Sequence, residues 1–251
     1  MAFIDTLKKV AGYVIPTSGS PNADLEKLAV YSYNLDGTPV TPFQRKRVNC
    51  NAFSLWTVTG NVVGSGVVSN RADFLRQQTG TTASSTVVSY TSIPGLLVGN
   101  ATYGLVDWSK ELWIFFGLRR ITSEAQTIAR IQIKQIETIG NLAALGLGIY
   151  IANLTLSGES YGTQRNTTSL GTTLVSSQSY QIAIHLQPSV PQIDWYVDGV
   201  LKGSETVAAN IPTVAATAPD NFVVSVENGV TGGTNAELFL LPNIDIVQLF
   251  A

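Results

Sequence analysis

Charged residues are scarce in this chain. Asp, Glu, Lys and Arg make up 13% of its 251 residues, roughly half the share of an average globular domain, and the formal net charge is −2. This balance gives no strong field to attract nucleic acid or an anionic membrane, so we expect neither as a partner. No run of about 18 apolar residues is present either, so we expect no membrane-spanning helix.

Residues that commonly build metal, redox and nucleophilic sites are almost missing. The chain has one cysteine, Cys50, and one histidine, His185. One cysteine cannot form an internal disulfide, and one histidine cannot complete a zinc site made of several histidines or cysteines. His185 alternates with Ile184 in a strand-like stretch, so we expect an outward or hydrogen-bonded imidazole and not a catalytic base. We expect no metal and no cofactor.

One basic cluster stands out against this low charge. Arg45, Lys46 and Arg47 follow Pro42. Three adjacent cations near a proline are typical of a solvated turn, so we predict an exposed turn here. The alternative is contact with an anionic partner.

The first 28 residues differ in pattern from the rest of the chain. Apolar residues recur at helical spacing up to Pro16, and residues 17–21 have the composition of a linker. We predict an N-terminal helical arm and linker over residues 1–28 that docks on a neighbouring subunit, the alternative being packing on its own domain. The order of residues typical of a secretory signal is not recognised. The predicted assembly contacts of the arm are Phe3, Ile4, Leu7, Val10 and Val14.

Residues 29–251 have the pattern of a β-sandwich domain. About a dozen short segments alternate apolar and polar residues, are separated by Gly, Pro, Asn or Asp, and show no intervening helices. We therefore predict an all-β fold, a two-sheet antiparallel jelly-roll sandwich preceded by the short helical arm. A helix over 141–152 is the alternative to the strand from Leu147 to Leu156. Gly146 and Gly148 favour the strand. The main predicted strands are Phe53 to Val58, Thr86 to Tyr90, Leu112 to Leu118, Ile128 to Ile136, Leu147 to Leu156, Tyr180 to Leu186, Ile193 to Val197, Val200 to Lys202, Phe222 to Val226, Glu237 to Leu241 and Ile244 to Phe250.

A hairpin in the last third carries a family resemblance. The stretch from Tyr180 to His185, followed by Ile193 to Leu201 with its Trp-Tyr-Val-Asp-Gly turn, resembles the concanavalin A-like lectin and glucanase jelly rolls. The terminal strand and the apolar strand that starts at Leu112 are similar to strands of that family, and the resemblance covers residues 50–251. It implies the fold but selects no function, because lectins, glycosidases, laminin-type modules and virus coat or fibre proteins share it.

The resemblance also indicates where an enzyme of this family would carry its acids. Its glycosidases have a strand with the pattern Glu-x-Asp-x-x-Glu, because the acid and the nucleophile face one groove about 5 Å apart. No such run occurs here. Four acids near strands stand singly, and we expect them to be solvated or turn residues: Glu111, Glu124, Glu137 and Asp245. We therefore predict no catalytic residues and no enzymatic activity.

Lectins of this family bind sugars on aromatic platforms beside Asp and Asn loops that hold calcium. Tyr103 and Trp108 are the best candidates for stacking on a sugar, the alternative being ordinary core or interface aromatics. No segment has the spacing of a dedicated cation loop. Three Asn-x-Ser/Thr sequons begin at Asn100, Asn153 and Asn166, and they matter only if the protein meets a glycosylating apparatus.

Low charge, abundant Ser and Thr, a docking arm and the lack of an active-site pattern favour a structural assembly protein. We expect a virion subunit of a capsid, turret or fibre, in a virion or extracellular surface assembly. Its expected partners are copies of itself in a homo-oligomer and other structural proteins, with glycans as a further ligand class. The alternative function is a carbohydrate-binding module or lectin.

Overall fold

The fold is known from a computed structural model. It describes residues 43–49, 57–58, 67–71, 74–92, 106–120, 127–134, 142, 145–214, 220–229 and 236–249. The predicted helical arm, its five apolar contact residues and the boundary between residues 28 and 29 lie outside these ranges.

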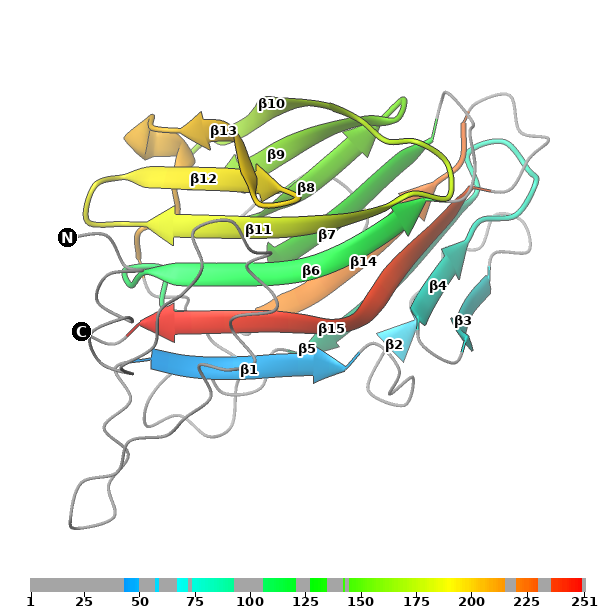
Figure 1. The fold of residues 1–251 in the computed structure, drawn as a ribbon, viewed down its shortest axis with the longest axis horizontal. Helices are drawn as coiled ribbons and strands as arrows, with labels where there is room; N and C mark the ends of the chain where they lie inside the picture. Colours follow the sequence, from blue (N-terminus) through cyan, green and yellow to red (C-terminus); the bar gives the residue numbers. More distant parts are fainter. Residues whose placement is uncertain are drawn as a thin grey trace, which may run out of the picture.

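Eight strands form the sheet that lies nearer the viewer in Figure 1, and we call it the front sheet. Its order is β13-β12-β11-β6-β15-β4-β3, and β1 pairs with β15 beside this path. The long β15 holds the sheet together, because it pairs with β6, with β4 and with β1. The strands are β1 (Phe43–Asn49), β3 (Val67–Arg71), β4 (Phe74–Gln78), β6 (Leu112–Arg120), β11 (Ser179–Gln187), β12 (Gln192–Val197), β13 (Val200–Glu205) and β15 (Glu237–Leu249).

Seven strands form the back sheet, in the order β10-β9-β8-β7-β14-β5-β2. Every recorded strand pair in both sheets is antiparallel. In the described part of the chain the only helical element is a 3-10 turn, η2 (Ala208–Asn210), and no helix there is long and apolar enough to cross a membrane. The prediction of an all-β, two-sheet antiparallel sandwich is confirmed. The back-sheet strands are β2 (Thr57–Val58), β5 (Thr86–Ser92), β7 (Ile128–Lys134), β8 (Gly146–Ala152), β9 (Thr155–Tyr161), β10 (Arg165–Thr173) and β14 (Asn221–Glu227).

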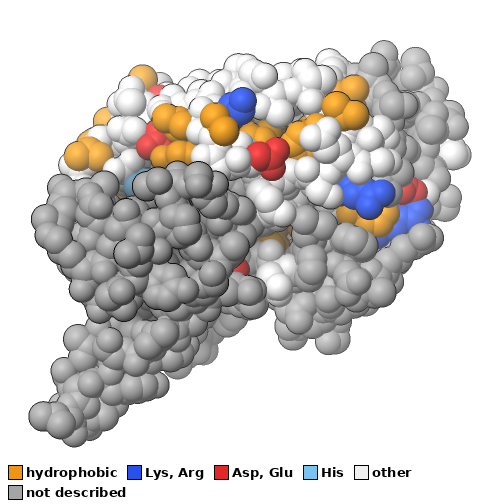
Figure 2. Space-filling view, in the orientation of Figure 1, with side chains coloured by type: hydrophobic (Ala, Val, Ile, Leu, Met, Phe, Trp, Pro, Cys, Tyr) orange, Lys and Arg blue, Asp and Glu red, His pale blue; other side chains and the backbone are white. Residues whose placement is uncertain are grey.

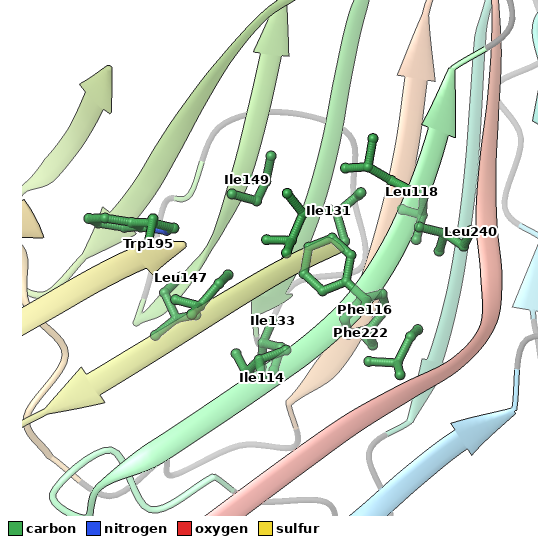
Figure 3. Packing of buried hydrophobic residues seen from close by; sticks show 14 of the residues in the cluster. Ile114, Phe116, Leu118, Ile131, Ile133, Leu147, Ile149, Trp195, Phe222 and Leu240 are labelled. Carbon is green, nitrogen blue, oxygen red and sulfur yellow. The ribbon is translucent and has the colours of Figure 1, made fainter. Parts of the chain in front are cut away.

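The hydrophobic core fills the space between the two sheets (Figure 3). Alternation along each strand sends every second side chain inward, so β6 contributes Ile114 and Phe116, and β7 contributes Ile131 and Ile133. Phe116 meets Phe222 of β14 edge to face, with ring centroids 6.1 Å apart. Each large side chain buried in this way contributes roughly 1.5–3 kcal/mol of transfer free energy.

Trp195 crosses from the front sheet to the back sheet. It is fully buried, and its indole Nε1 donates a hydrogen bond of 3.1 Å to the carbonyl oxygen of Gly148 on β8. The ring lies flat against Gly158 of β9, where a Cβ atom would come within 2.3 Å of the indole carbon Cε2. Only glycine leaves room for the ring at this position, so packing against Trp195 of the front sheet requires glycine at position 158 of β9.

The edge of the sandwich at β13 and β10 is closed by side chains. Glu205 of β13 accepts hydrogen bonds from the side chains of Asn166 and Asn210 and from the backbone N–H groups of Thr206 and Val207. A register shift opposite Trp195 places one extra residue in β13. Such a bulge on an edge strand hinders pairing with another chain.

Several predicted strand boundaries differ from the observed ones. The predicted strand Leu147 to Leu156 is two strands, because Asn153 and Leu154 adopt positive φ angles of 48° and 68° and turn the chain between β8 and β9. Conversely, the two predicted strands at the C-terminal end form one strand, β15, whose register shifts between Leu240 and Ile244. The helix considered for 141–152 is wrong over the described part, since β8 begins at Gly146.

The basic cluster also differs from its prediction. Arg45, Lys46 and Arg47 lie in β1, where Arg47 is the register partner of Asp245, and not in an exposed turn. The physical reason is the length of β15: without β1, the backbone polar groups along one side of its second half would have no strand partner.

Candidate functional site

Three neighbouring strands of the front sheet place aromatic rings on its outer face, away from the core. Trp113 on β6 is the register partner of His185 on β11, and His185 is in turn the partner of Asp194 on β12. Their neighbours along each chain, such as Ile114 and Ile184, point inward into the core. We call the following set the outer-face cluster: Glu111, Trp113, Phe115, His185, Gln187, Gln192, Asp194 and Tyr196.

The indole ring of Trp113 is the centre of this cluster. It stacks on the imidazole of His185 with ring centroids 3.8 Å apart and an interplanar angle of 13°. Phe115 lies parallel to it at 5.5 Å, and Tyr196 lies at 6.0 Å with an angle of 29°. Phe115 and His185 are only 4% and 6% exposed, whereas Trp113 and Tyr196 are half-buried. The last two rings therefore carry most of the aromatic surface that a ligand can reach.

His185 has a carboxylate partner at the edge of the cluster. Its Nε2 atom lies 2.6 Å from Oε1 of Glu111, the residue immediately before β6. The expectation of a hydrogen-bonded imidazole on the outer side of its strand agrees with this geometry. Glu111 is paired rather than freely solvated, which corrects the prediction for that acid.

Asp194 is the hub of the polar half of the cluster. The Nε2 atom of Gln192 lies 2.8 and 3.0 Å from its two carboxylate oxygens, and Nε2 of Gln187 donates at 3.2 Å. Ser204 of β13 donates through Oγ at 2.5 Å. Burial, and secondly the charge of Asp194, raise the pKa of Tyr196, so its phenol remains a protonated donor at neutral pH.

Accessibility on this face is greatest at its β13 edge but does not rise evenly, because His185 on β11 and Asp194 on β12 are only 6% and 5% exposed. Val247 and Asp245 on β15 are buried, Trp113 and Tyr196 are half-buried, and Leu201 on β13, opposite Tyr196, is 51% exposed. Figure 2 shows this face, with hydrophobic side chains gathered among acidic ones over β11 to β13. The accessible part of the cluster thus borders an apolar strip.

One of the two residues predicted to stack on a sugar is not accessible. Trp108 is fully buried in the hydrophobic core and offers no ring face to a sugar, which corrects that assignment. Tyr103 lies outside the described residues. Trp113, predicted only as part of an apolar strand, is half-buried on the outer face because it alternates with Ile114 on β6.

The three sequons lie in different surroundings. Asn153 is exposed at the turn between β8 and β9. Asn166 is half-buried on β10, and its side-chain nitrogen donates to Glu205. Asn100 lies outside the described residues.

The acids of this face do not form the predicted glycosidase pattern. The outward positions of β6 and the residue before it are Glu111, Trp113, Phe115 and Gly117, so a single carboxylate is followed by two aromatic rings. Asp245 is 7% exposed on β15 and is not the solvated acid that was expected. Glu124 and Glu137 lie outside the described residues. Within the described ranges, no group of three or more His, Cys, Asp or Glu side chains is placed to hold a metal ion.

The loop that follows β14 is held by structural hydrogen bonds. The side-chain nitrogen of Asn228 donates to the carbonyl oxygen of Gly80 at 3.0 Å, and its oxygen accepts from the N–H of Gly229 at 2.9 Å. Asn228 is buried and ties two loops of the back sheet together.

No protein-family model matches the chain, and no curated protein matches it. Several solved structures, in contrast, match the chain. The chain is similar to a Bacillus licheniformis β-glucanase (14% identity, 82% of this chain and 97% of that one, TM-score 0.53) and to peanut lectin (11%, 82% and 97%, TM-score 0.51). It is also similar to the CBM2 module of the evolved Dit protein of Lactobacillus casei BL23 phage J-1 (13%, 83% and 97%, TM-score 0.53).

A sialidase chain matches as well, and the present chain spans 18% of its length. At these identities the similarity establishes the fold alone. The concanavalin A-like jelly roll expected from the Tyr180–Leu201 hairpin is confirmed.

Proposed function

We propose that this protein binds carbohydrate through the outer-face cluster. The observation that carries the proposal is one surface on which two half-buried aromatic rings, Trp113 and Tyr196, adjoin the hydrogen-bonded group of Asp194, Gln187 and Gln192. A sugar ring presents C–H groups on its faces and hydroxyls on its rim. Apolar ring surface beside fixed polar groups is the combination that holds and orients such a ligand.

The fold supports the same reading by analogy. A lectin, a glucanase and a CBM2 module share the architecture at TM-scores above 0.5. Because one fold serves many functions, this analogy raises the expectation for a sugar ligand and assigns none.

The proposed activity is binding without hydrolysis. A retaining glycosidase holds two carboxyl groups about 5–5.5 Å apart on either side of the bond that it cleaves. Here the strand that would carry them has Trp113 and Phe115 after Glu111, and Glu111 is engaged by His185. This arrangement supports a binding site and does not provide the acid and nucleophile of that mechanism.

Glycan arrays followed by calorimetric titration test the proposal. We expect a saturable oligosaccharide ligand, and we expect Tyr196→Ala and Gln192→Ala each to weaken binding about tenfold, equal to about 1.4 kcal/mol. Thr167→Ala, at an exposed position on β10 of the back sheet, is the matched control and should bind as the wild type does. An array without any ligand, or a ligand whose affinity none of the cluster variants changes, contradicts the proposal.

A virion structural subunit is the second candidate. The CBM2 module among the similar structures belongs to a phage protein, which supports a virion or extracellular surface assembly as the location. Val175, Val190, Val200 and Leu201 are each more than half exposed, and exposed apolar side chains suit contacts between copies or with other structural proteins. The two candidates are compatible, since a virion subunit can itself bind glycans.

The native mass tests this second candidate. Light scattering coupled to size exclusion should give a multiple of the 26.8 kDa chain mass, and deletion of residues 1–28 should reduce it. A monomer at all concentrations, unchanged by the deletion, contradicts the assembly role.

A further inference from the structure

The polar groups of the outer-face cluster are arranged mainly as hydrogen-bond acceptors. Asp194 accepts from both glutamine side chains, and a carboxylate can pair only with their nitrogen atoms. This fixes the orientation of both amides: each nitrogen faces Asp194, and each Oε1 oxygen is left on the other side of its amide group. The described part of the chain provides no hydrogen-bond partner for the Oε1 atoms of Gln187 and Gln192.

Among the described residues, no cation pairs with the carboxylate of Asp194. Its hydrogen-bond partners are Gln187, Gln192 and Ser204, all of them neutral. Glu111 adds a second carboxylate beside His185, with which it is paired, and His185 lies between Trp113 and Asp194 in the sheet. Asp194 is only 5% exposed, so its charge acts on a ligand from beneath the surface, where the accessible polar atoms are the side-chain oxygens of Gln187 and Gln192 and the partly exposed carboxylate of Glu111.

Such a surface discriminates between classes of glycan. Neutral sugars offer hydroxyl donors to the glutamine oxygens and to the second oxygen of Glu111. Glycans with carboxylate, sulfate or phosphate groups bring negative charge towards Asp194 and Glu111, where like charges repel. Building on the proposed function, we infer that the outer-face cluster selects neutral, hydroxyl-donating glycans and rejects acidic ones.

A matched pair of ligands tests the inference. Each neutral oligosaccharide that binds is compared with its uronic acid counterpart, which replaces the C6 hydroxymethyl group by a carboxylate on the same backbone. We expect the wild type to prefer the neutral member at least tenfold in 20 mM NaCl, and we expect the ratio to shrink in 500 mM NaCl because salt screens the repulsion. Asp194→Asn should reduce the ratio at least threefold, and Thr167→Ala should leave it unchanged.

Glu111→Gln provides an independent variant if Asp194→Asn fails to fold, since Glu111 is partly exposed and outside the Asp194 hydrogen-bond group. Its expected effect is a smaller reduction of the same ratio. Uronic acid ligands that bind as tightly as the neutral ones, or a preference that salt and both variants leave intact, overturn this inference while the proposed function stands. A protein that binds neither member of any pair overturns the proposed function itself.

Discussion

Asp220 is a buried acid with a strongly raised pKa, and replacing it by asparagine tests how this residue makes the stability of the fold depend on pH. The residue is fully buried immediately before β14, and its Oδ2 atom accepts a hydrogen bond of 2.8 Å from the backbone N–H of Val106. Its Oδ1 atom has no hydrogen-bond partner among the described residues. Burial raises the pKa of this carboxyl from 3.8 to about 7, and the hydrogen bond from Val106 offsets only part of that effect.

The sign and size of the consequence follow from proton linkage. The folded protein binds the proton of Asp220 more tightly than the unfolded chain does, so its free energy of unfolding falls as the pH rises from about 4 to about 7. The full difference between 3.8 and about 7 corresponds to about 4 kcal/mol, of which about 3 kcal/mol is lost between pH 5 and pH 8.5. Asp220→Asn keeps an acceptor for Val106 and has no charge to bury, so its stability should lack this dependence.

Urea unfolding followed by far-ultraviolet circular dichroism measures the effect. At pH 5 we expect the wild type and Asp220→Asn to differ by less than about 1 kcal/mol, whereas at pH 8.5 the variant should be the more stable protein by about 3 kcal/mol. Glu227→Gln, at a partly exposed acid at the end of β14, controls for the loss of one carboxylate. A difference between wild type and Asp220→Asn that stays constant from pH 5 to pH 8.5 would refute the reasoning.

Two further predictions concern the contacts between the sheets and the closed edge. Gly158→Ala should lower the free energy of unfolding by roughly 1–3 kcal/mol in urea titrations, because its Cβ would meet the ring of Trp195. In the control Gly171→Ala, the Cβ would touch nothing within 4 Å, so the free energy of unfolding should fall only by the cost of placing alanine at a positive φ. For Glu205, burial acts to raise the pKa, but hydrogen bonds from Val207, Asn166, Asn210 and Thr206 outweigh it and lower the pKa. Its contribution to stability is therefore present above its ordinary pKa of 4.5 and is lost as the pH falls below that value, and Glu205→Gln should flatten the acid limb of a thermal-denaturation profile.

The parts of the fold that could be predicted are those in which local pattern and tertiary burial agree. The hairpin of β11 and β12 alternates cleanly, and each of its inward residues is in the core. β10 was missed because it has one fully buried side chain, Leu170, in nine residues, and so carries no alternation to detect. At Asn153 and Leu154 the apolar pattern continued through a turn, because leucine at positive φ is not a usual turn signal.

The candidate site could be predicted only in fragments. The position of His185 on an outer face follows from alternation within its own strand. Its contact with Trp113 depends on the pairing of β6 and β11, which four other strands separate along the chain, and no local pattern specifies that register. The choice of Trp108 over Trp113 as the accessible indole failed for the same reason, since burial is a property of the assembled sheets.

The placement of the tryptophans also allows their intrinsic fluorescence to report on the two sides of the front sheet. Trp108 and Trp195 are sealed in the core, whereas Trp113 is half-buried in the outer-face cluster and lies face to face with an imidazole ring. Among these three indoles, an aqueous quencher such as iodide reaches Trp113 first. Changes in its emission therefore follow events on the outer surface of the front sheet, while the two sealed indoles report on the integrity of the sandwich.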